Sequence, residues 1–513
     1  MGHVLHGLRT DDKPIRQGTS HKLRSVPHFE RSTMRYATTG SVILASLVGA
    51  GAWAQTAEQQ STLADQQSVA VTIYNENLAL VKDTRKLQLK AGTQALAFRD
   101  VSARMRPETA QFRSASHPGG LSVLEQNFDF DLLTPQKLLE KYVGKTVNVI
   151  RTNPASGAET QESAQVLAAN GGVVMRFGNR IESGVPGRIA YGELPENLRD
   201  RPTLVMTLSN ATTQTQDVEL SYLTSGLAWK ADYVAELNAA DDKLDLSGWV
   251  TLTNTSGASY RNAKLQLVAG DVNQAPPERR MRLEGTVAMA AAPMAKSRDM
   301  TEEGLFEYHL YTLGRPTTIA ENQTKQVSLL SANGVSARKE FLLRGSEYYY
   351  QSAYGDLGQK LKVGVFVEFD NKEASKLGMP LPKGVVRVYK RDSAGNAQFI
   401  GEDRIDHTAK NESVRLKLGD AFDVTADKKQ TDFKRRAKEE KFGSVFESAY
   451  EVTLKNAKKE VVTVTVQEPL PGDWQVLSES HPHSKVSSNT ARWKIAIPAE
   501  GKVSLVYRVL VRY

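Results

Sequence analysis

Alternation of apolar and polar residues, with a period of two, runs through most of this chain. Val69, Val71 and Ile73 are its first clear instance, and a turn at Asn75–Asn77 precedes the next apolar run. A period of two places successive side chains on opposite faces of a strand, so that one face can be buried. The pattern predicts a small antiparallel β unit at residues 68–133.

One helix is marked by its ends. Thr134 is a suitable N-cap, Pro135 fits the first helical position, and Gly144 ends the apolar period. Four or five short strand patterns follow, separated by turns that contain asparagine and glycine. A short helix that leads into short strands predicts a small SH3-like or Sm-like barrel at residues 134–195, with an ordinary β-meander as the alternative.

A short motif recurs three times further along the chain. Threonine, leucine, a variable residue and asparagine end a strand, and polar residues and a new alternating strand follow. The copies are Thr207–Asn210, Thr251–Asn254 and Thr453–Asn456. A strand, a polar corner and another strand at this spacing are typical of immunoglobulin-like sandwiches.

The repeated motif predicts two β-sandwich regions, at residues 196–273 and 304–513. Between them, residues 274–303 are rich in alanine, proline and methionine and predict a linker or long loop. The expected fold class is therefore all-β and multi-domain: immunoglobulin-like β-sandwich units plus a small SH3/Sm-like β-barrel preceded by one short helix.

The N-terminal part has the three features of a secretory signal peptide. Arg35 supplies a positive charge, Ser41–Gly51 is an apolar run, and Ala52–Ala54 is an A-x-A cleavage sequence. We expect residues 34–54 to be the signal, with cleavage near Ala54/Gln55. The mature protein would then be periplasmic or secreted, and would contact a membrane only through the signal segment before cleavage.

The segments before and after the expected signal peptide are both polar, but they have different interpretations. Residues 1–33 are basic and polar, which indicates a mis-called start or an extended n-region. An uncleaved anchor at residues 36–54 is a third interpretation, although its glycines and hydroxyl residues make a weak membrane span. Residues 55–67 are rich in Gln, Ser and Thr and predict a flexible N-terminus.

Charge and cysteine content exclude several classes of protein. The formal net charge is +8, and half of it lies in residues 1–54, so the remainder is close to neutral and gives no support for nucleic-acid binding. The chain has no cysteine, which excludes disulfides, thiolate zinc sites and a catalytic thiol.

The sequence has no motif that identifies a catalytic residue or a cofactor site. The chain contains no Gly-x-Ser-x-Gly, His-Glu-x-x-His or Gly-x-Gly-x-x-Gly sequence. His481 and His483 are the only close histidine pair in the mature part, and their spacing on an extended segment can direct both imidazoles to one side for a metal. A solvated loop with two histidines is the alternative.

Two further clusters stand out. Tyr348, Tyr349, Tyr350 and Tyr354 would form an exposed aromatic surface for a glycan or a protein if they lie on a strand, and strand packing is the alternative. The densest basic stretch, from Lys428 to Arg436, alternates with acidic residues, which favours a solvated hairpin or loop over a site for an anionic polymer.

Several segments together resemble a bacterial family of exported proteins. They carry a domain of unknown function that also occurs in mucoidy inhibitor A homologues. The segments are Thr72–Val81, Leu223–Trp229 with Tyr233, Asn262–Val272 and Leu470–Trp474. The resemblance spans about residues 69–513. It implies an extracytoplasmic, β-rich envelope protein without defined catalytic residues, and the family's name suggests a link to exopolysaccharide control.

Three hypotheses of function follow. The first is a non-enzymatic binding or structural β protein in the periplasm, whose partner is another envelope protein or a surface polysaccharide. The second is a metal-dependent or hydrolytic enzyme that uses His481, His483 and an acid such as Asp271 or Asp473. The third is an outer-membrane β-barrel, because the last strand pattern, Val503–Tyr513, alternates and ends in an aromatic residue.

Overall fold

A computed structural model describes residues 58–75, 77–184, 187–195, 198–270, 272–274, 300–439 and 441–513. All of them belong to one compact unit that runs from Thr56 to Tyr513. The expected signal peptide and most of the expected linker lie outside the described residues. Strands account for most of the described chain, which confirms the prediction of an all-β, multi-domain fold.

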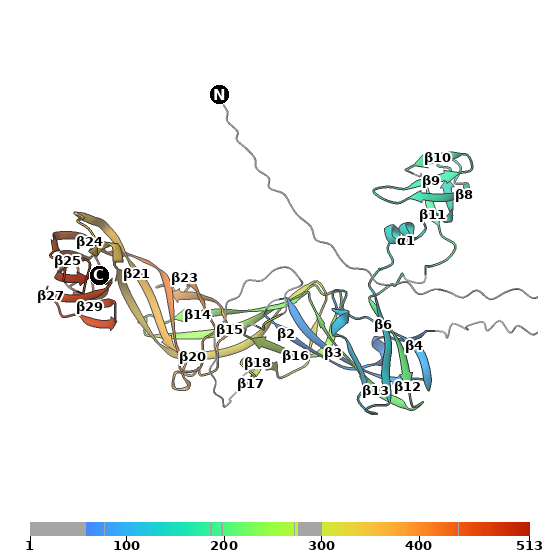
Figure 1. Ribbon diagram of the computed structural model, residues 1–513, viewed down its shortest axis with the longest axis horizontal. Helices are drawn as coiled ribbons and strands as arrows, with labels where there is room; N and C mark the ends of the chain where they lie inside the picture. Colours follow the sequence, from blue (N-terminus) through green and yellow to red (C-terminus); the bar gives the residue numbers. More distant parts are fainter. Residues whose placement is uncertain are drawn as a thin grey trace, which may run out of the picture. The chain divides into compact units, whose positions relative to one another are not determined.

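Two sheets contain the strands of the N-terminal region (Figure 1). The first has the order β1-β4-β12-β6 and contains β1 (Gln59–Ser61), β4 (Gly92–Arg99), β12 (Thr203–Asn210) and β6 (Leu121–Asp129). The second has the order β17-β18-β16-β2-β3-β13-β5, with β19 beside β16. Its strands are β2 (Gln66–Tyr74), β3 (Leu78–Gln88), β5 (Gln111–Ser114), β13 (Thr215–Thr224), β16 (Tyr260–Ala269), β17 (Met300–Leu305), β18 (Tyr308–Leu313) and β19 (Thr317–Ile319).

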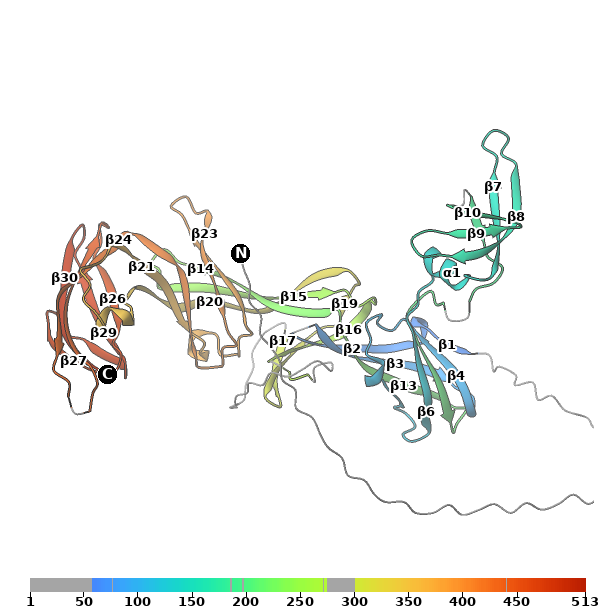
Figure 2. The ribbon, with the colours of Figure 1, turned by 45° about the horizontal axis from the view of Figure 1, so that its top comes forward.

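A small helix-and-sheet unit is inserted between β6 and β12. Thr134 caps helix α1 (Pro135–Lys141) as expected, because its hydroxyl accepts the amide N–H of Lys137. Five antiparallel strands follow in the order β10-β9-β8-β7-β11: β7 (Thr146–Thr152), β8 (Glu159–Ala168), β9 (Val174–Phe177), β10 (Arg180–Ser183) and β11 (Arg188–Ala190). Among the described residues no ladder joins β10 to β11, so the sheet is open; Figure 2 shows α1 beside it. Its core is separate from the others and includes Leu139, Val149 and Phe177.

The remaining strands form one hydrogen-bonded series of thirteen. Its main path is β23-β22-β14-β15-β20-β21-β24-β25-β30-β27, and β26, β29 and β28 join it through β20. The strands are β14 (Leu227–Leu237), β15 (Lys243–Asn254), β20 (Gln323–Arg344), β21 (Asp356–Asp370), β22 (Gly384–Arg391), β23 (Ala397–Ile405), β24 (Ser413–Arg436), β25 (Val445–Asn456), β26 (Val462–Pro469), β27 (Asp473–Glu479), β28 (Ser484–Ser487), β29 (Thr490–Ile497) and β30 (Lys502–Arg512). Four short 3-10 helices lie between strands: η1 (Leu63–Asp65), η2 (Pro107–Thr109), η3 (Glu347–Tyr350) and η4 (Glu373–Ser375).

Strands on the two sides of residues 271–299 pair directly with one another. β15 pairs with β20, β16 pairs with β18, and β14 runs parallel to β22. The strands after residue 300 therefore complete sheets that begin before residue 271. The sequence did not decide this pairing.

The C-terminal core lies between two layers of that long series (Figure 2). β24, β25 and β30 supply one layer, and β20, β26 and β29 supply the other. Trp493 of β29 stacks on Tyr507 of β30, with ring centroids 4.8 Å apart, and both side chains are fully buried. Aromatic contacts of this kind join the two layers.

The same core corrects the interpretation of the basic stretch. Lys428 was expected in a solvated hairpin or loop, but its side chain is only 2% exposed and points into the core. Its neighbour Lys429 lies on the solvent side of β24, where it contacts Glu451. Adjacent strand residues face opposite ways, so two neighbouring lysines have opposite surroundings.

Candidate functional site

One face of five neighbouring strands forms a surface that we call the cationic face. The strands lie in the order β29-β26-β20-β21-β24. Residues that are directly paired across strands point to the same side of a sheet. Gln467 pairs with Arg344 on one side and with Arg492 on the other, so these three residues form a row across three strands.

Two further rows lie on the same face. In the first, Thr465 of β26 pairs with Leu342 of β20 and with Lys494 of β29. In the second, Glu368 of β21 pairs with both Arg338 of β20 and Arg415 of β24. Opposite this face, the alternate residues of β20, β26 and β29 fill the C-terminal core. The two-residue period of each strand therefore separates a charged surface from an apolar core.

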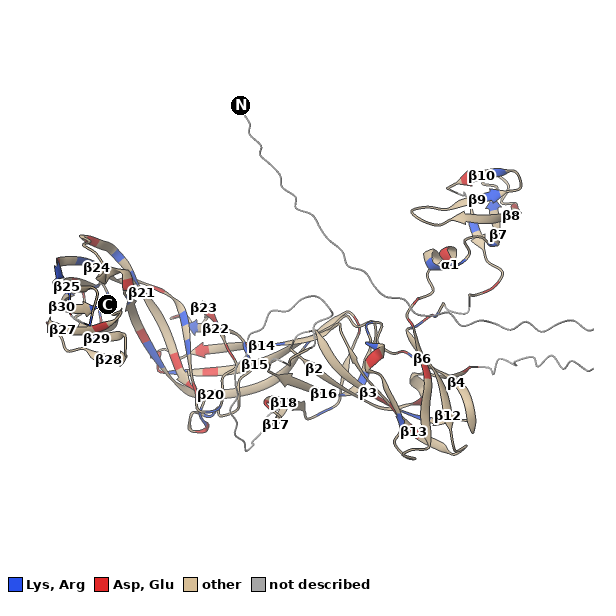
Figure 3. Cartoon of the chain, viewed as in Figure 1, with Lys and Arg blue, Asp and Glu red and all other residues tan. Residues whose placement is uncertain are grey.

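The cationic face is hollowed. The hollow has a volume of ≈ 490 Å³. Its lining consists of Arg338, Lys339, Glu340, Arg344, Glu368, Arg415, Thr463, Thr465, Gln467, Arg492 and Lys494. Six of these residues are cationic and two are acidic. Figure 3 shows positive and negative residues close together on the strands around β20 and β21.

Acidic partners neutralise one half of the cationic face. Arg338 contacts Glu368 at 2.8 Å and Asp370 at 3.0 Å, and Arg415 contacts Glu340 at 2.7 Å. Hydrogen bonds from Arg338 and then from Ser413 hold the pKa of Asp370 well below its usual range. These pairs hold the arginines in place but leave them little charge to offer a ligand.

The other half of the cationic face has no acidic partners. Arg344, Arg492 and Lys494 make no ion pair with any described residue, and the Nε of Arg492 is buried without a hydrogen-bond partner there. A buried donor without an acceptor costs free energy. Guanidinium groups bind carboxylates and phosphates through two parallel hydrogen bonds.

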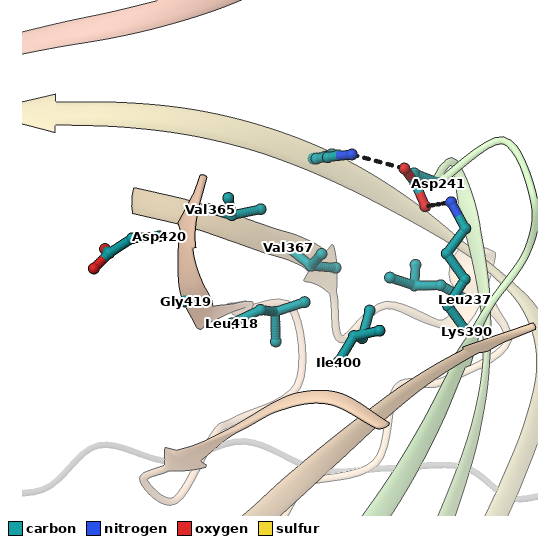
Figure 4. A pocket seen from close by; sticks show the side chains of 10 residues that line it. Leu237, Asp241, Val365, Val367, Lys390, Ile400, Leu418, Gly419 and Asp420 are labelled. Carbon is teal, nitrogen blue, oxygen red and sulfur yellow. Dashed lines mark hydrogen bonds and ion pairs between the residues drawn. The ribbon is translucent and has the colours of Figure 1, made fainter. Parts of the chain in front are cut away.

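A second hollow, of ≈ 210 Å³, has mainly apolar walls that include Val365, Val367 and Ile400 (Figure 4). Asp241 lies at one end, where Lys339 and Lys390 both contact its carboxylate. Burial acts to raise the pKa of Asp241, but the hydrogen bonds from the two lysines outweigh it and hold that pKa below its ordinary value. The charges at this end are therefore already paired.

Three tyrosines of the cluster, Tyr348, Tyr349 and Tyr350, lie on a 3-10 helix and not on a strand, and Tyr354 follows it in a loop. Tyr349 and Tyr350 of η3 are buried, whereas Tyr348 is 51% exposed. Tyr348 packs edge-to-face against Tyr354, with ring centroids 5.6 Å apart. Only this pair could present an aromatic surface, and a role for it in binding stays a prediction.

The histidine pair lies between β27 and β28. The Nδ1 of His483 contacts Glu479 at 2.9 Å, and the ring of His483 lies between those of Trp474 and Trp493. His481 contacts Ser480 instead. Within the described ranges no group of three His, Cys, Asp or Glu residues is arranged to hold a metal ion. A metal role for the two histidines stays a prediction.

Two acids were proposed for an enzyme beside this pair. Asp473 contacts Arg512 at 3.2 Å, and Asp271 lies outside the described residues. In the part of the chain that the structure describes, no helix is long and apolar enough to cross a membrane.

Sequence reasoning missed the cationic face because its residues come from distant segments. Arg344 is more than a hundred residues from Arg492 and Lys494, and no sequence motif joins them. The one local signal is that Arg492 and Lys494 are two residues apart and therefore on the same side of β29. Pairing of β29 with β26, and of β26 with β20, was needed to bring them to Arg344.

Comparison with known proteins identifies a family for this chain. A search of curated proteins found no match. A family model described as "Domain of unknown function (DUF4139)" matches residues 218–513, which is more than half of the chain. The matched range contains the cationic face, the second hollow and the C-terminal core. The chain therefore belongs to the family described as a domain of unknown function (DUF4139).

Proposed function

We propose that this protein is a non-enzymatic binding protein of the bacterial cell envelope. In this proposal the signal at residues 34–54 directs it to the periplasm or the exterior, and the cationic face holds an anionic surface polysaccharide. The resemblance to exported bacterial proteins that share a domain with mucoidy inhibitor A homologues supports the location. The resemblance does not identify the ligand. The cationic face supports an anionic ligand.

The observation that carries the proposal is the unpaired half of the cationic face. Arg344, Arg492 and Lys494 line one hollow without acidic partners among the described residues, and one of their donors is buried and unsatisfied. Like charges that line one hollow repel one another, so a bound anion would stabilise the arrangement. A ligand with negative charges at intervals would contact all three.

Neutral polar residues favour a sugar polymer over an acidic peptide. Thr463 and Gln467 lie among the cations and offer hydrogen-bond donors and acceptors to the hydroxyl groups of a glycan. Arg344 and Arg492 are two strand spacings apart, which is about 10 Å. An extended chain of uronate residues crossing the strands could reach both.

Binding is tested with the exported protein and a uronate polymer, polygalacturonate, with neutral dextran as the reference. We expect binding to polygalacturonate alone. A variant with Arg344→Gln, Arg492→Gln and Lys494→Gln should bind at least about tenfold more weakly, because three charge-assisted contacts are lost. Equal binding by this variant, or equal binding of dextran, would contradict the proposal. Preference for an acidic peptide over the polymer would contradict the ligand class.

The matched control removes the same number of positive charges elsewhere. Lys82, Lys86 and Lys264 are exposed on the eight-stranded sheet and make no ion pair with a described residue. Replacement of all three by glutamine changes the net charge equally. Binding should be preserved in this variant if the cationic face is the site, and lost equally if only net charge matters.

The location is tested separately by fractionation of the native host. We expect the mature protein outside the cytoplasm, with an N-terminus near Gln55. Recovery in the cytoplasm with residues 34–54 still attached would contradict export, without bearing on the ligand of the cationic face.

A further inference from the structure

A lysine and a glutamate meet inside the C-terminal core. The Nζ of Lys428, on β24, lies 2.7 Å from the Oε1 of Glu468, on β26. The side chains are 2% and 0% exposed. β24 and β26 belong to the two layers of the sandwich, so the contact joins one layer to the other.

The lysine has few other partners. Among the described residues, the amine of Lys428 donates a hydrogen bond only to Glu468. The rings of Tyr349, Tyr450 and Tyr507 surround the same nitrogen, with centroids at 4.3, 5.2 and 5.9 Å. Aromatic faces attract a cation, but they do not replace the hydrogen bonds that an ammonium group makes in water.

The glutamate is held from two further sides. Its second oxygen, Oε2, accepts a hydrogen bond from the Tyr350 hydroxyl at 2.8 Å, and that hydroxyl lies 3.0 Å from the hydroxyl of Tyr507. At Gly345 of the facing backbone, a Cβ atom would collide with the Glu468 carboxylate. The carboxyl group is therefore held against the amine with little room to turn.

Two charges are costly in this core. Removal of an ammonium and a carboxylate from water is expensive, and their attraction often does not compensate for it. Burial lowers the pKa of Lys428, which favours the neutral, nucleophilic amine. A neutral amine beside a neutral carboxylic acid is the pair of groups from which an amide forms.

We propose that Lys428 and Glu468 condense to an intramolecular amide, an isopeptide bond that joins β24 to β26. The lone pair of Nζ attacks Cδ of the protonated Glu468, and the Tyr350 hydroxyl stabilises the negative charge that develops on Oε2. A proton passes from Nζ to Oε1, the bond from Cδ to Oε1 breaks, and Oε1 leaves as water. One C–N bond replaces one C–O bond, and no oxidant or reductant is needed.

A neighbouring pair provides an internal comparison. Lys429 of β24 pairs with Glu451 of the neighbouring strand β25 on the opposite face of β24, and their nitrogen–oxygen distance is also 2.7 Å. Their side chains are 58% and 28% exposed. Water and counter-charge keep such a pair ionised, so proximity without burial should leave it unlinked.

Mass spectrometry of the exported protein tests the proposal. Under denaturing conditions, which dissociate an ion pair but not an amide, the mass should be lower by one water than the mass calculated from the N-terminus found for that protein. Proteolytic mapping should give a branched peptide that contains Lys428 and Glu468. A Lys428→Arg variant should have the full mass, because its guanidinium does not condense.

Two results would overturn the proposal. One is a native protein of full mass whose Lys428 and Glu468 are recovered in separate, unmodified peptides. The other is a branched peptide through Lys429 and Glu451, since burial would then not determine where the bond forms. Neither result requires any variant to fold.

Discussion

Asn254 and Asn456 make the same set of hydrogen bonds at the ends of two different strands. Each Oδ1 accepts a hydrogen bond from the backbone N–H of the residue two positions later, at 3.0 Å. Each Nδ2 donates to the carbonyl of the residue four positions later, at 2.8 Å. It also donates to two successive carbonyls at the end of a strand far away in the sequence, β19 for Asn254 and β29 for Asn456. Both side chains are buried. One side chain thereby satisfies three backbone carbonyls at each corner.

Loss of either asparagine should destabilise the fold. Asn456→Ala would leave three backbone carbonyls without their side-chain donor, in one buried and two partly buried hydrogen bonds, and we expect a loss of about 2–3 kcal/mol in the free energy of unfolding. Urea denaturation measures it. Asn127 is exposed on β6, and Asn127→Ala should change stability by less than about 0.5 kcal/mol. Equal effects of the two substitutions would show that the corner hydrogen bonds contribute little.

The two members of the buried pair should depend on each other. Lys428→Met leaves the buried Glu468 carboxyl group without the nitrogen that it contacts, and the expected loss of stability is at least about 1–3 kcal/mol. Replacement of both residues by methionine removes the unpartnered carboxyl group, so the double variant should unfold at higher denaturant concentration than the Lys428→Met variant. Additive losses would contradict this coupling.

Gly345 should tolerate no side chain. A methyl group there would collide with the Glu468 carboxylate, so Gly345→Ala must displace the carboxyl group or the backbone. We expect a loss of about 2 kcal/mol or more in thermal or chemical denaturation. A Cβ at Gly355 would meet no atom within 4 Å, and Gly355→Ala is the control, with little change expected.

Stability should fall between about pH 10 and pH 12. Burial raises the pKa of Tyr260 and of Tyr450 to about 12, whereas an unfolded tyrosine ionises near 10. Below pH 10 both states are protonated and the contribution is complete. From pH 10 to 12 the unfolded chain loses protons that the folded chain keeps, so the free energy of unfolding decreases as the pH rises.

Each of the two tyrosines should contribute about 2–3 kcal/mol to that decrease. Urea denaturation at several alkaline pH values measures it, and the Tyr450→Phe variant should show a smaller slope over the same interval. An unchanged slope in that variant would mean that Tyr450 ionises equally easily in the folded and unfolded states.

Binding at the cationic face should be sensitive to salt. Contacts between exposed charges weaken as ionic strength shortens the Debye length. We expect affinity for polygalacturonate to decrease steadily from about 0.05 to 0.5 M NaCl. The Arg344→Gln, Arg492→Gln, Lys494→Gln variant should have a shallower dependence, because fewer ionic contacts remain to be screened. Parallel dependences for native protein and variant would place the ionic contacts elsewhere.

The sequence predicted the elements that depend on local pattern. Helix α1 begins after Thr134 as expected, since capping and proline placement are local effects. The strands of the first β unit follow the two-residue period. Two of the three repeated asparagines, Asn254 and Asn456, prove to be equivalent corners, because the motif reports a shared local geometry.

The sequence motif does not mark every asparagine corner, and one of its three copies has a different set of hydrogen bonds. Asn371 donates to the carbonyls of Met379 and Ala409 in a similar way, although no Thr-Leu pair precedes it. Asn210, in the first copy of the motif, instead donates to Lys90 and Thr212. The asparagine and its surroundings determine the corner, and the two residues before it do not.

The sequence by itself determined the all-β class, the local turns and the one helix, because these follow from side-chain periodicity and backbone preference within a few residues. Tertiary structure decided which strands pair, and with them the row of Arg344 and Arg492 and the burial of Lys428. These features depend on contacts between residues far apart in the chain. Adjacent residues of a strand point to opposite faces, so one can be buried while the next is exposed. Lys428 and Lys429 differ for that reason alone.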